Sequence, residues 1–150
     1  MGLETAVGSS LVQAMKAKDQ GALRALRAIK AEILLFKTSG TGAELDDAAE
    51  IQILQKMIKQ RKESLAIYEE QSREDLAQKE REEIAVLEQF LPEQMDASEL
   101  QKFISDIVNE VGATSMKDMG RVMSEANQRL AGRADGKAIA TIVKSLLSGA

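Results

Sequence analysis

The sequence predicts an all-helical protein in two parts, an N-terminal helical domain over residues 1–95 and a small C-terminal three-helix bundle over residues 96–150. Apolar residues recur three or four positions apart along most of the chain, and no segment alternates apolar and polar residues. Aromatic residues make up only 3% of the chain, so Leu, Ile, Val, Met and Ala must build the core, which suits helix packing. The single proline, Pro92, disfavours helical geometry in the residue before it, and we expect the domain break near Met95.

Four helices are expected in the N-terminal part. The first spans residues 3–17, and the second begins at Asp19 with a regular apolar stripe of Leu23, Leu26, Ile29, Ile33 and Phe36. Residues 38–42 read Thr-Ser-Gly-Thr-Gly, which predicts an exposed connection. The third helix restarts after it at an acidic segment, which suits the positive end of a helix dipole. The fourth spans residues 72–90, where a charged composition leaves a narrow apolar seam that can pair with the third helix as a hairpin.

Three shorter helices are expected after Pro92. Asp96 and Glu99 have the spacing of a capping box at the start of the first, and Gly112 ends it. Ser115 is placed to cap the second, which closes at Gly132. Asp135 opens the third. Each helix has one apolar face, which predicts a bundle.

Composition excludes most enzyme chemistry. The chain has no cysteine and no histidine, so it lacks disulfides, thiolate nucleophiles, imidazole bases and the usual ligands of zinc, haem and iron–sulfur clusters. No catalytic residue, metal site or cofactor is predicted. Ser9 and Ser10 follow Gly8 as in the glycine-serine segment of amidases, but ordinary helix residues explain them better. Glu80, Glu82 and Glu83 alternate with basic residues and predict a solvated face whose pKa values nothing shifts.

The same sequence contains no apolar run long enough to span a membrane, and its first fifteen residues lack the pattern of a signal peptide. We therefore expect a cytoplasmic protein without a membrane partner.

Basic residues are unevenly distributed, although the chain carries a net charge of -4. From Gly112 onward six cations face three acidic residues, a local charge of +3. Within this segment Arg133 and Lys137 flank a glycine-bounded turn at the start of the last helix, where backbone N–H groups favour a phosphate. In the simpler alternative, Gly132 only closes one helix and Asp135 only caps the next, and both interpretations can hold together.

A second basic surface is predicted on two helices of the N-terminal part. Its members are spaced three apart: Arg24, Arg27 and Lys30 on one helix, and Lys56, Lys59 and Lys62 on the other. Such stripes either shield apolar seams with their methylene stems or form a ligand surface.

Five segments in order over residues 60–136 resemble the bacterial YqeY family. They are Gln60-Arg61-Lys62-Glu63-Ser64, Leu91-Pro92-Glu93-Gln94, Val111-Gly112-Ala113, the seven residues from Lys117 to Met123, and Gly132-Arg133-Ala134-Asp135-Gly136. The resemblance implies an all-helical fold whose C-terminal part is similar to the tail domain of the B subunit of aspartyl/glutamyl-tRNA amidotransferase. That tail domain binds tRNA and catalyses no reaction. The family is often described as a carbon–nitrogen ligase with glutamine as amido donor, yet the amidase and kinase centres have no counterpart in these residues.

The resemblance implies tRNA as the partner, together with an aminoacyl-tRNA synthetase or an amidotransferase, and gives no reason to expect DNA. The tail-like positions are Lys117, Arg121, Gly132, Arg133, Gly136 and Lys137. Because the chain has one tyrosine and no tryptophan, we expect recognition of the RNA backbone and not of the bases.

Two other functions compete with tRNA binding. The first is a protein–protein interaction module in translation without direct RNA binding, which the long charged helices and the adaptable side chains of Met116, Met119 and Met123 favour. The second is true amidotransfer, which predicts glutamine-dependent conversion of Glu-tRNA by this chain alone.

Overall fold

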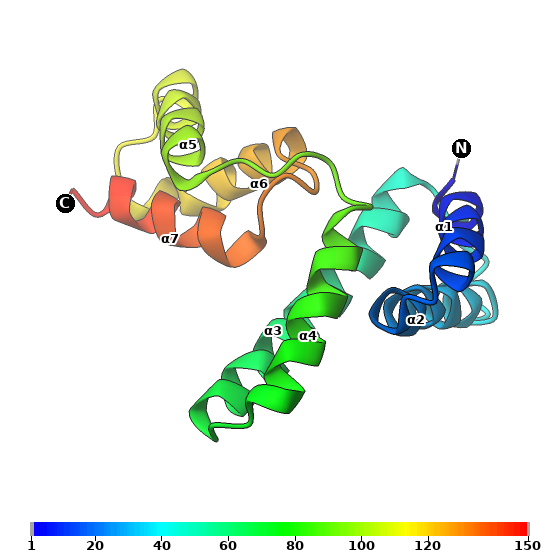
Figure 1. Ribbon diagram of the computed structural model, residues 1–150. Helices are drawn as coiled ribbons and strands as arrows, with labels where there is room; N and C mark the ends of the chain where they lie inside the picture. Colours follow the sequence, from blue (N-terminus) through cyan, green and yellow to red (C-terminus); the bar gives the residue numbers. More distant parts are fainter. Residues whose placement is uncertain (1, 150) are drawn as a thin grey trace. The chain divides into compact units, whose positions relative to one another are not determined.

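The computed structural model describes residues 2–149, and this part of the chain folds into seven α-helices and one 3-10 turn, without a β-strand (Figure 1). The all-helical prediction is therefore confirmed. The chain divides into two compact units, residues 1–91 and 92–150. The division lies four residues before the break expected near Met95, because Gln94 and Met95 hydrogen-bond to the turn around Gly132 and Arg133 in the C-terminal unit.

The N-terminal unit contains α1 (Leu3–Ala17), α2 (Gln20–Lys37), α3 (Asp47–Glu70) and α4 (Glu74–Glu88). Lys18 adopts a left-handed conformation (φ 57°) and ends α1, and the Asp19 carboxylate accepts the N–H of Ala22 at 3.1 Å to cap α2. The Asp46 carboxylate caps α3 by accepting an N–H at 2.8 Å. The acidic restart predicted after residue 42 is thus the start of α3.

Figure 1 shows how these four helices pack. Helices α3 and α4 form an antiparallel hairpin, α2 lies against α4, and α1 lies against α2. Leu26, Ile29, Leu54 and Leu87 are almost completely buried in the shared core. Helices α1 and α2 cover one end of the hairpin, and the turn between α3 and α4 lies at the other end, away from them.

The C-terminal unit contains α5 (Ala97–Val111), the 3-10 turn η1 (Met116–Asp118), α6 (Met119–Arg129) and α7 (Gly136–Leu147). The capping box of Asp96 and Glu99 is formed, and Gly112 ends α5 in the left-handed conformation (φ 68°). Ser115 caps η1 and not α6, so α6 begins at Met119, three residues later than a cap at Ser115 predicts. Ile104, Val122 and Val143, each buried completely, join the three helices in one core.

Candidate nucleic-acid interface

The turn between α6 and α7 is built from residues 130–135. Gly132 has a positive φ of 78°, a conformation that glycine adopts without strain, and the N–H of Arg133 donates to the carbonyl of Leu130 at 2.7 Å. The Asp135 carboxylate then accepts the N–H of Ala138 at 2.7 Å and caps α7. The simpler interpretation of this turn, a helix end followed by a helix cap, is therefore present in the structure.

A polar network ties this turn to the segment around Pro92, forty residues earlier in the chain. The Gln94 side-chain amide donates to the carbonyl of Gly132 and to that of Pro92, and the N–H of Met95 donates to the carbonyl of Arg133 at 3.0 Å. The Arg133 guanidinium donates through Nε to the carbonyl of Glu93 at 3.1 Å. The network therefore joins two of the five family-like segments, those that begin at Leu91 and at Gly132. The sequence analysis did not predict this contact, because the two segments are far apart in the chain.

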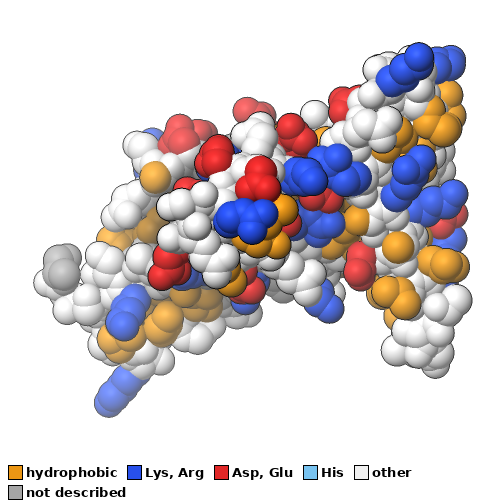
Figure 2. All heavy atoms as spheres, turned by 60° about the horizontal axis from the view of Figure 1, so that its bottom comes forward, with side chains coloured by type: hydrophobic (Ala, Val, Ile, Leu, Met, Phe, Trp, Pro, Cys, Tyr) orange, Lys and Arg blue, Asp and Glu red, His pale blue; other side chains and the backbone are white. Residues whose placement is uncertain are grey.

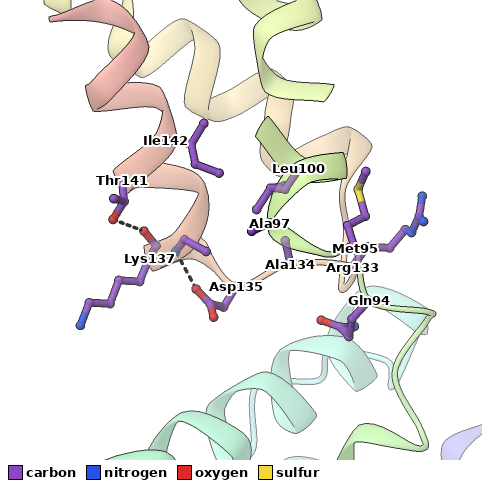
Figure 3. Close-up of a pocket in the computed structure, with 11 residues that line it drawn as sticks. Gln94, Met95, Ala97, Leu100, Arg133, Ala134, Asp135, Lys137, Thr141 and Ile142 are labelled. Carbon is purple, nitrogen blue, oxygen red and sulfur yellow. Dashed lines mark hydrogen bonds between the residues drawn. The ribbon is translucent and has the colours of Figure 1, made fainter. Parts of the chain in front are cut away.

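A groove of about 540 Å³ lies beside this turn, between the start of α5 and the first turns of α7. Met95, Leu100 and Ile142 contribute to its apolar lining, while Arg133 and Lys137 lie on opposite rims. Figure 3 shows these two side chains pointing away from each other. In the structure these two side chains therefore do not point towards a common position, and a shared phosphate site remains a prediction.

The reason for this divergence is local. Arg133 is the third residue after Leu130, the C-cap of α6, and its side chain turns towards the Glu93 carbonyl, whereas Lys137 belongs to α7. Between them the Asp135 carboxylate already provides an anion at the start of α7, where a bound phosphate would otherwise lie. In these orientations the two cations are placed to contact separate phosphates.

The other two predicted cations of this unit, Arg121 and Lys117, differ in whether a carboxylate neutralises their charge. Arg121 pairs with Asp118 at 3.1 Å, and Asp118 also accepts the N–H of Thr114 at 2.9 Å. The hydrogen bonds from the Thr114 and Ser115 N–H groups and the nearby Arg121 charge lower the pKa of Asp118. Lys117 is exposed on η1 and forms no ion pair within residues 2–149.

Charge over the whole C-terminal unit is nearly balanced. Residues 92–150 carry seven Lys and Arg against eight Asp and Glu, a net charge of -1, because the positive segment after Gly112 is offset by acidic residues up to Glu110. Arg129 is neutralised by Glu110 at 2.7 Å and by Glu125 at 2.9 Å. Within the described residues, the cations of this unit beyond Gly112 that have no carboxylate partner are Lys117, Arg133, Lys137 and Lys144.

The cations of the second predicted basic surface differ in their surroundings. On α2, Arg24 pairs with Glu82 of α4 at 3.2 Å, whereas Arg27 and Lys30 line a groove between α1 and α2. On α3, the side chains of Lys56, Lys59 and Lys62 are all exposed. These two stripes are separate features of the N-terminal unit.

One charged cluster was missed by the sequence analysis. Arg61 of α3 lies 3.7 Å from Glu83 of α4, and only 18% of the Arg61 side chain and 15% of the Glu83 side chain are exposed. Arg61 Nε and one carboxylate oxygen of Glu80 are buried without a hydrogen-bond partner. Burial raises the pKa of Glu80, and the neighbouring Glu83 charge raises it further. The solvated face predicted for residues 80–83 is therefore wrong for Glu80 and Glu83, and right for the exposed Glu82.

The signal that could have located this cluster was Arg61 itself, because it interrupts the apolar stripe of α3 at a core-facing position. No three carboxylates lie close enough to hold a metal ion in the part of the chain that the structure describes. Within the same residues no helix combines the length and apolarity of a membrane span.

Comparison with known proteins places the chain in a family. Residues 5–147 match the family described as Yqey-like protein. Similar curated proteins share the name "Altered inheritance of mitochondria protein 41, mitochondrial". The one from Vanderwaltozyma polyspora is 31% identical over 116 residues, 73% of this chain and 62% of that protein. The one from Pyrenophora tritici-repentis is 32% identical over 127 residues, 81% of this chain and 69% of that protein.

A third relative, from Meyerozyma guilliermondii, has the same name and is 34% identical over 96 residues, 57% of this chain and 51% of that protein. The matched segments therefore span between half and about two thirds of the length of these relatives. Since the family match extends over almost the whole chain and agrees with the sequence motifs, the chain belongs to the Yqey-like protein family.

Proposed function

We propose that this protein is a non-catalytic tRNA-binding accessory of translation, which binds the RNA backbone through the α6–α7 side of its C-terminal unit. The observation that carries the proposal is the set of cations without a carboxylate partner in this region: Lys117, Arg133, Lys137 and Lys144. Family likeness to the amidotransferase tail domain supports the same partner. An aminoacyl-tRNA synthetase or an amidotransferase acting on the same tRNA is the protein partner we propose, and the cytoplasm is the compartment.

The arrangement of the cations favours several separate phosphate contacts. Lys137, Thr141 and Lys144 lie three or four residues apart and are exposed, so they share one face of α7. Lys144 lies seven positions after Lys137, which corresponds to a rise of about 10 Å along the helix axis, a longer distance than one phosphate spans. Arg133 and Lys117 add cations from the preceding turn and from η1. A dispersed set of this kind follows a backbone and reads no base sequence.

Chemistry is not part of the proposal. A chain without cysteine and histidine lacks the nucleophiles and bases of most transfer reactions. Ion pairs and a helix-capping hydrogen bond lower the pKa values of Glu74, Asp75 and Asp96, and burial beside Glu83 raises that of Glu80. The description of the family as an amidotransferase would then refer to the related enzyme and its tRNA substrate, and not to a reaction that this chain catalyses.

A gel-shift titration with total tRNA tests the proposal. We expect retention that weakens as salt rises, because bound cations release counterions from the RNA. The double substitution Lys137→Ala with Lys144→Ala should weaken retention and reduce the salt slope by about two, one for each phosphate contact. The control carries the same charge change on exposed lysines outside the proposed surface, Lys79→Ala with Lys102→Ala, and should behave as wild type. Equal losses in both variants would refute the proposed surface.

A second candidate function is a protein-interaction module without RNA binding. The observation that favours it is the groove beside Met95 and Leu100, whose lining is mainly apolar although it lies between two cations. Co-purification with and without RNase separates the two functions. A protein partner that survives digestion, in a protein that shows no salt-sensitive tRNA retention, would favour this second candidate.

A further inference from the structure

A groove of about 690 Å³ lies between α1 and α2 in the N-terminal unit. Leu34 contributes exposed apolar surface to it, the buried Val7 and Ile33 lie at its base, and Arg27 and Lys30 contribute charge. The C-terminal cation of α2, Lys37, also lines the groove but is paired with Glu4 of α1. The groove is therefore an apolar channel with a basic rim, formed entirely by one helical pair.

Gly8 of α1 lines this groove. A glycine inside a helix costs roughly 0.5–1 kcal/mol relative to alanine, so its presence at mid-helix in α1 needs a reason. A Cβ built on Gly8 meets no atom within 4 Å, so close packing against α2 is not that reason. Its backbone is helical, so a left-handed conformation is not the reason either. What the missing side chain provides is space in the groove.

The charges on the rim differ from the other cations of α2. Arg24 pairs with Glu82, whereas Arg27 and Lys30 have no carboxylate partner in the described part of the chain. These two cations remain available in a protein whose net charge is -4. They recur with Leu34 at spacings of three and four residues, so cations and apolar surface lie on the same face of α2.

Apolar exposure continues along α1 beyond the groove. Val12 and Met15 are 45% and 53% exposed, and Leu34 in the groove is 62% exposed. Gly8, Val12 and Met15 are spaced four and three residues apart and share one face of α1. Figure 2 shows Lys, Arg and hydrophobic side chains interspersed over the α1–α2 region, at the right of the view. This surface therefore combines exposed apolar side chains with unpaired cations, the two properties that would bind an acidic amphipathic helix.

We propose that the α1–α2 groove docks an acidic amphipathic helix from a partner protein. Lys37 lies ten positions after Arg27, which corresponds to a length of about 15 Å and accommodates apolar anchors at positions i, i+3 or i+4, and i+7 of a docked helix. Its anchors enter the space beside Gly8 and Leu34, and its acidic residues pair with Arg27 and Lys30. Bound RNA would leave Leu34 and Val12 against polar sugar and phosphate, so the apolar floor favours a peptide.

Fluorescence anisotropy of the full chain with a labelled synthetic peptide tests this site. The peptide has about 15 residues, enough to populate a helix, with leucines at helical spacing and glutamates on both flanks of the leucine stripe. We expect saturable binding that weakens with salt. Gly8→Leu fills the groove and should weaken binding by at least about tenfold, whereas Gly8→Ala should retain it. Both substitutions favour helix, so circular dichroism should show folded protein in each case.

Charge variants give an independent second arm. Arg27→Gln with Lys30→Gln should weaken peptide binding and remove most of its salt dependence. The matched control Lys56→Gln with Lys59→Gln, on exposed positions of α3, should bind as wild type. Lys137→Ala with Lys144→Ala should also leave peptide binding unchanged, so this site and the proposed tRNA surface can fail separately.

Three results would overturn the proposal: no saturable binding at peptide concentrations up to about 1 mM, undiminished binding by folded Gly8→Leu, or undiminished binding by Arg27→Gln with Lys30→Gln. Anionic vesicles and total tRNA are the alternative occupants. If the Arg27 and Lys30 substitutions reduce retention on either of these while peptide binding is absent, the groove belongs to a membrane surface or to RNA and not to a protein helix.

Discussion

The two units build helices in different ways. In the C-terminal unit, α5, α6 and α7 have 11–15 residues each, and side-chain caps open α5, η1 and α7. In the N-terminal unit, α3 has 24 residues but only three of them, Leu54, Met57 and Ile58, are buried. The long α3–α4 hairpin instead includes the mostly buried charges of Arg61 and Glu83. Side-chain caps also open α2 and α3, so local capping is common to both units, whereas the long hairpin depends in addition on contacts between α3 and α4.

The largest difference between the two units is expected when a core residue of one unit is replaced, because each unit has its own core. Ile104 is fully buried in the core of the C-terminal unit. Ile104→Ala should lower the free energy of unfolding by about 2–5 kcal/mol. Leu87→Ala should cost a similar amount in the N-terminal core. Hydrogen exchange should show lost protection in the unit that carries each substitution. Equal loss of protection in both units would contradict the separation of the two cores.

The next effect concerns the charge inside the hairpin. Arg61→Met leaves Glu80 and Glu83 without their cation and should destabilise the N-terminal unit by roughly 1–3 kcal/mol, below the cost of breaking a fully buried pair because both partners retain some solvent exposure. Urea unfolding measures the loss. The exposed neighbour provides the control, because Lys62→Met removes the same charge without opening the cluster. A stable Arg61→Met variant would mean that Arg61 does not hold the hairpin together.

A smaller effect is expected at the network that joins the two motifs of the C-terminal unit. Gln94→Ala removes the side-chain hydrogen bonds to the carbonyls of Pro92 and Gly132 and should cost about 1 kcal/mol. Thermal unfolding of Gln94→Ala beside Gln101→Ala, an exposed position on α5, measures the difference. Matching transition temperatures in the two variants would show that the network contributes no stability.

The smallest effect depends on pH. The pKa of Glu80 is raised in the folded protein, so its protonated form is favoured by folding. Its contribution to stability is fully present below the ordinary glutamate pKa of 4.5 and is lost as pH rises through the raised folded value. Glu80→Gln should therefore be more stable than wild type at pH 7, with the advantage shrinking on acidification. The exposed Glu82→Gln should show no such trend, and an advantage that grows on acidification would contradict the assignment.

Much of the fold could be predicted from the sequence because its signals are local. The first helix spans residues 3–17 as expected, and Asp19, Asp96, Gly112 and Asp135 cap the helices that their positions predicted. The error at Ser115, which caps a 3-10 turn before α6, is also local, since the same side chain suits either kind of helix start. Met116 is 41% exposed, whereas Met119 and Met123 pack on the core, a distinction that helical spacing alone did not make.

The candidate site was less predictable because side-chain direction depends on tertiary contacts. Arg133 and Lys137 are four residues apart and looked like neighbours, yet a carbonyl forty residues away in sequence fixes the direction of Arg133. Ion pairs in space likewise decide which cations remain available: Arg121 and Arg24 have carboxylate partners, whereas Lys137 and Arg27 have none within residues 2–149. Counting charges along a sequence cannot distinguish a cation that has a carboxylate partner in the fold from one that has none.

The measurement that tests the tRNA proposal most directly is a titration of the isotope-labelled full chain with total tRNA, followed by amide NMR. We predict that the largest shift changes fall on η1, on the turn before α7 and on the face of α7 that carries Lys137 and Lys144, and that they diminish as salt rises. The α1–α4 amides should change little. Changes confined to α1–α4, or no changes at low salt, would contradict an RNA-binding role for the C-terminal unit.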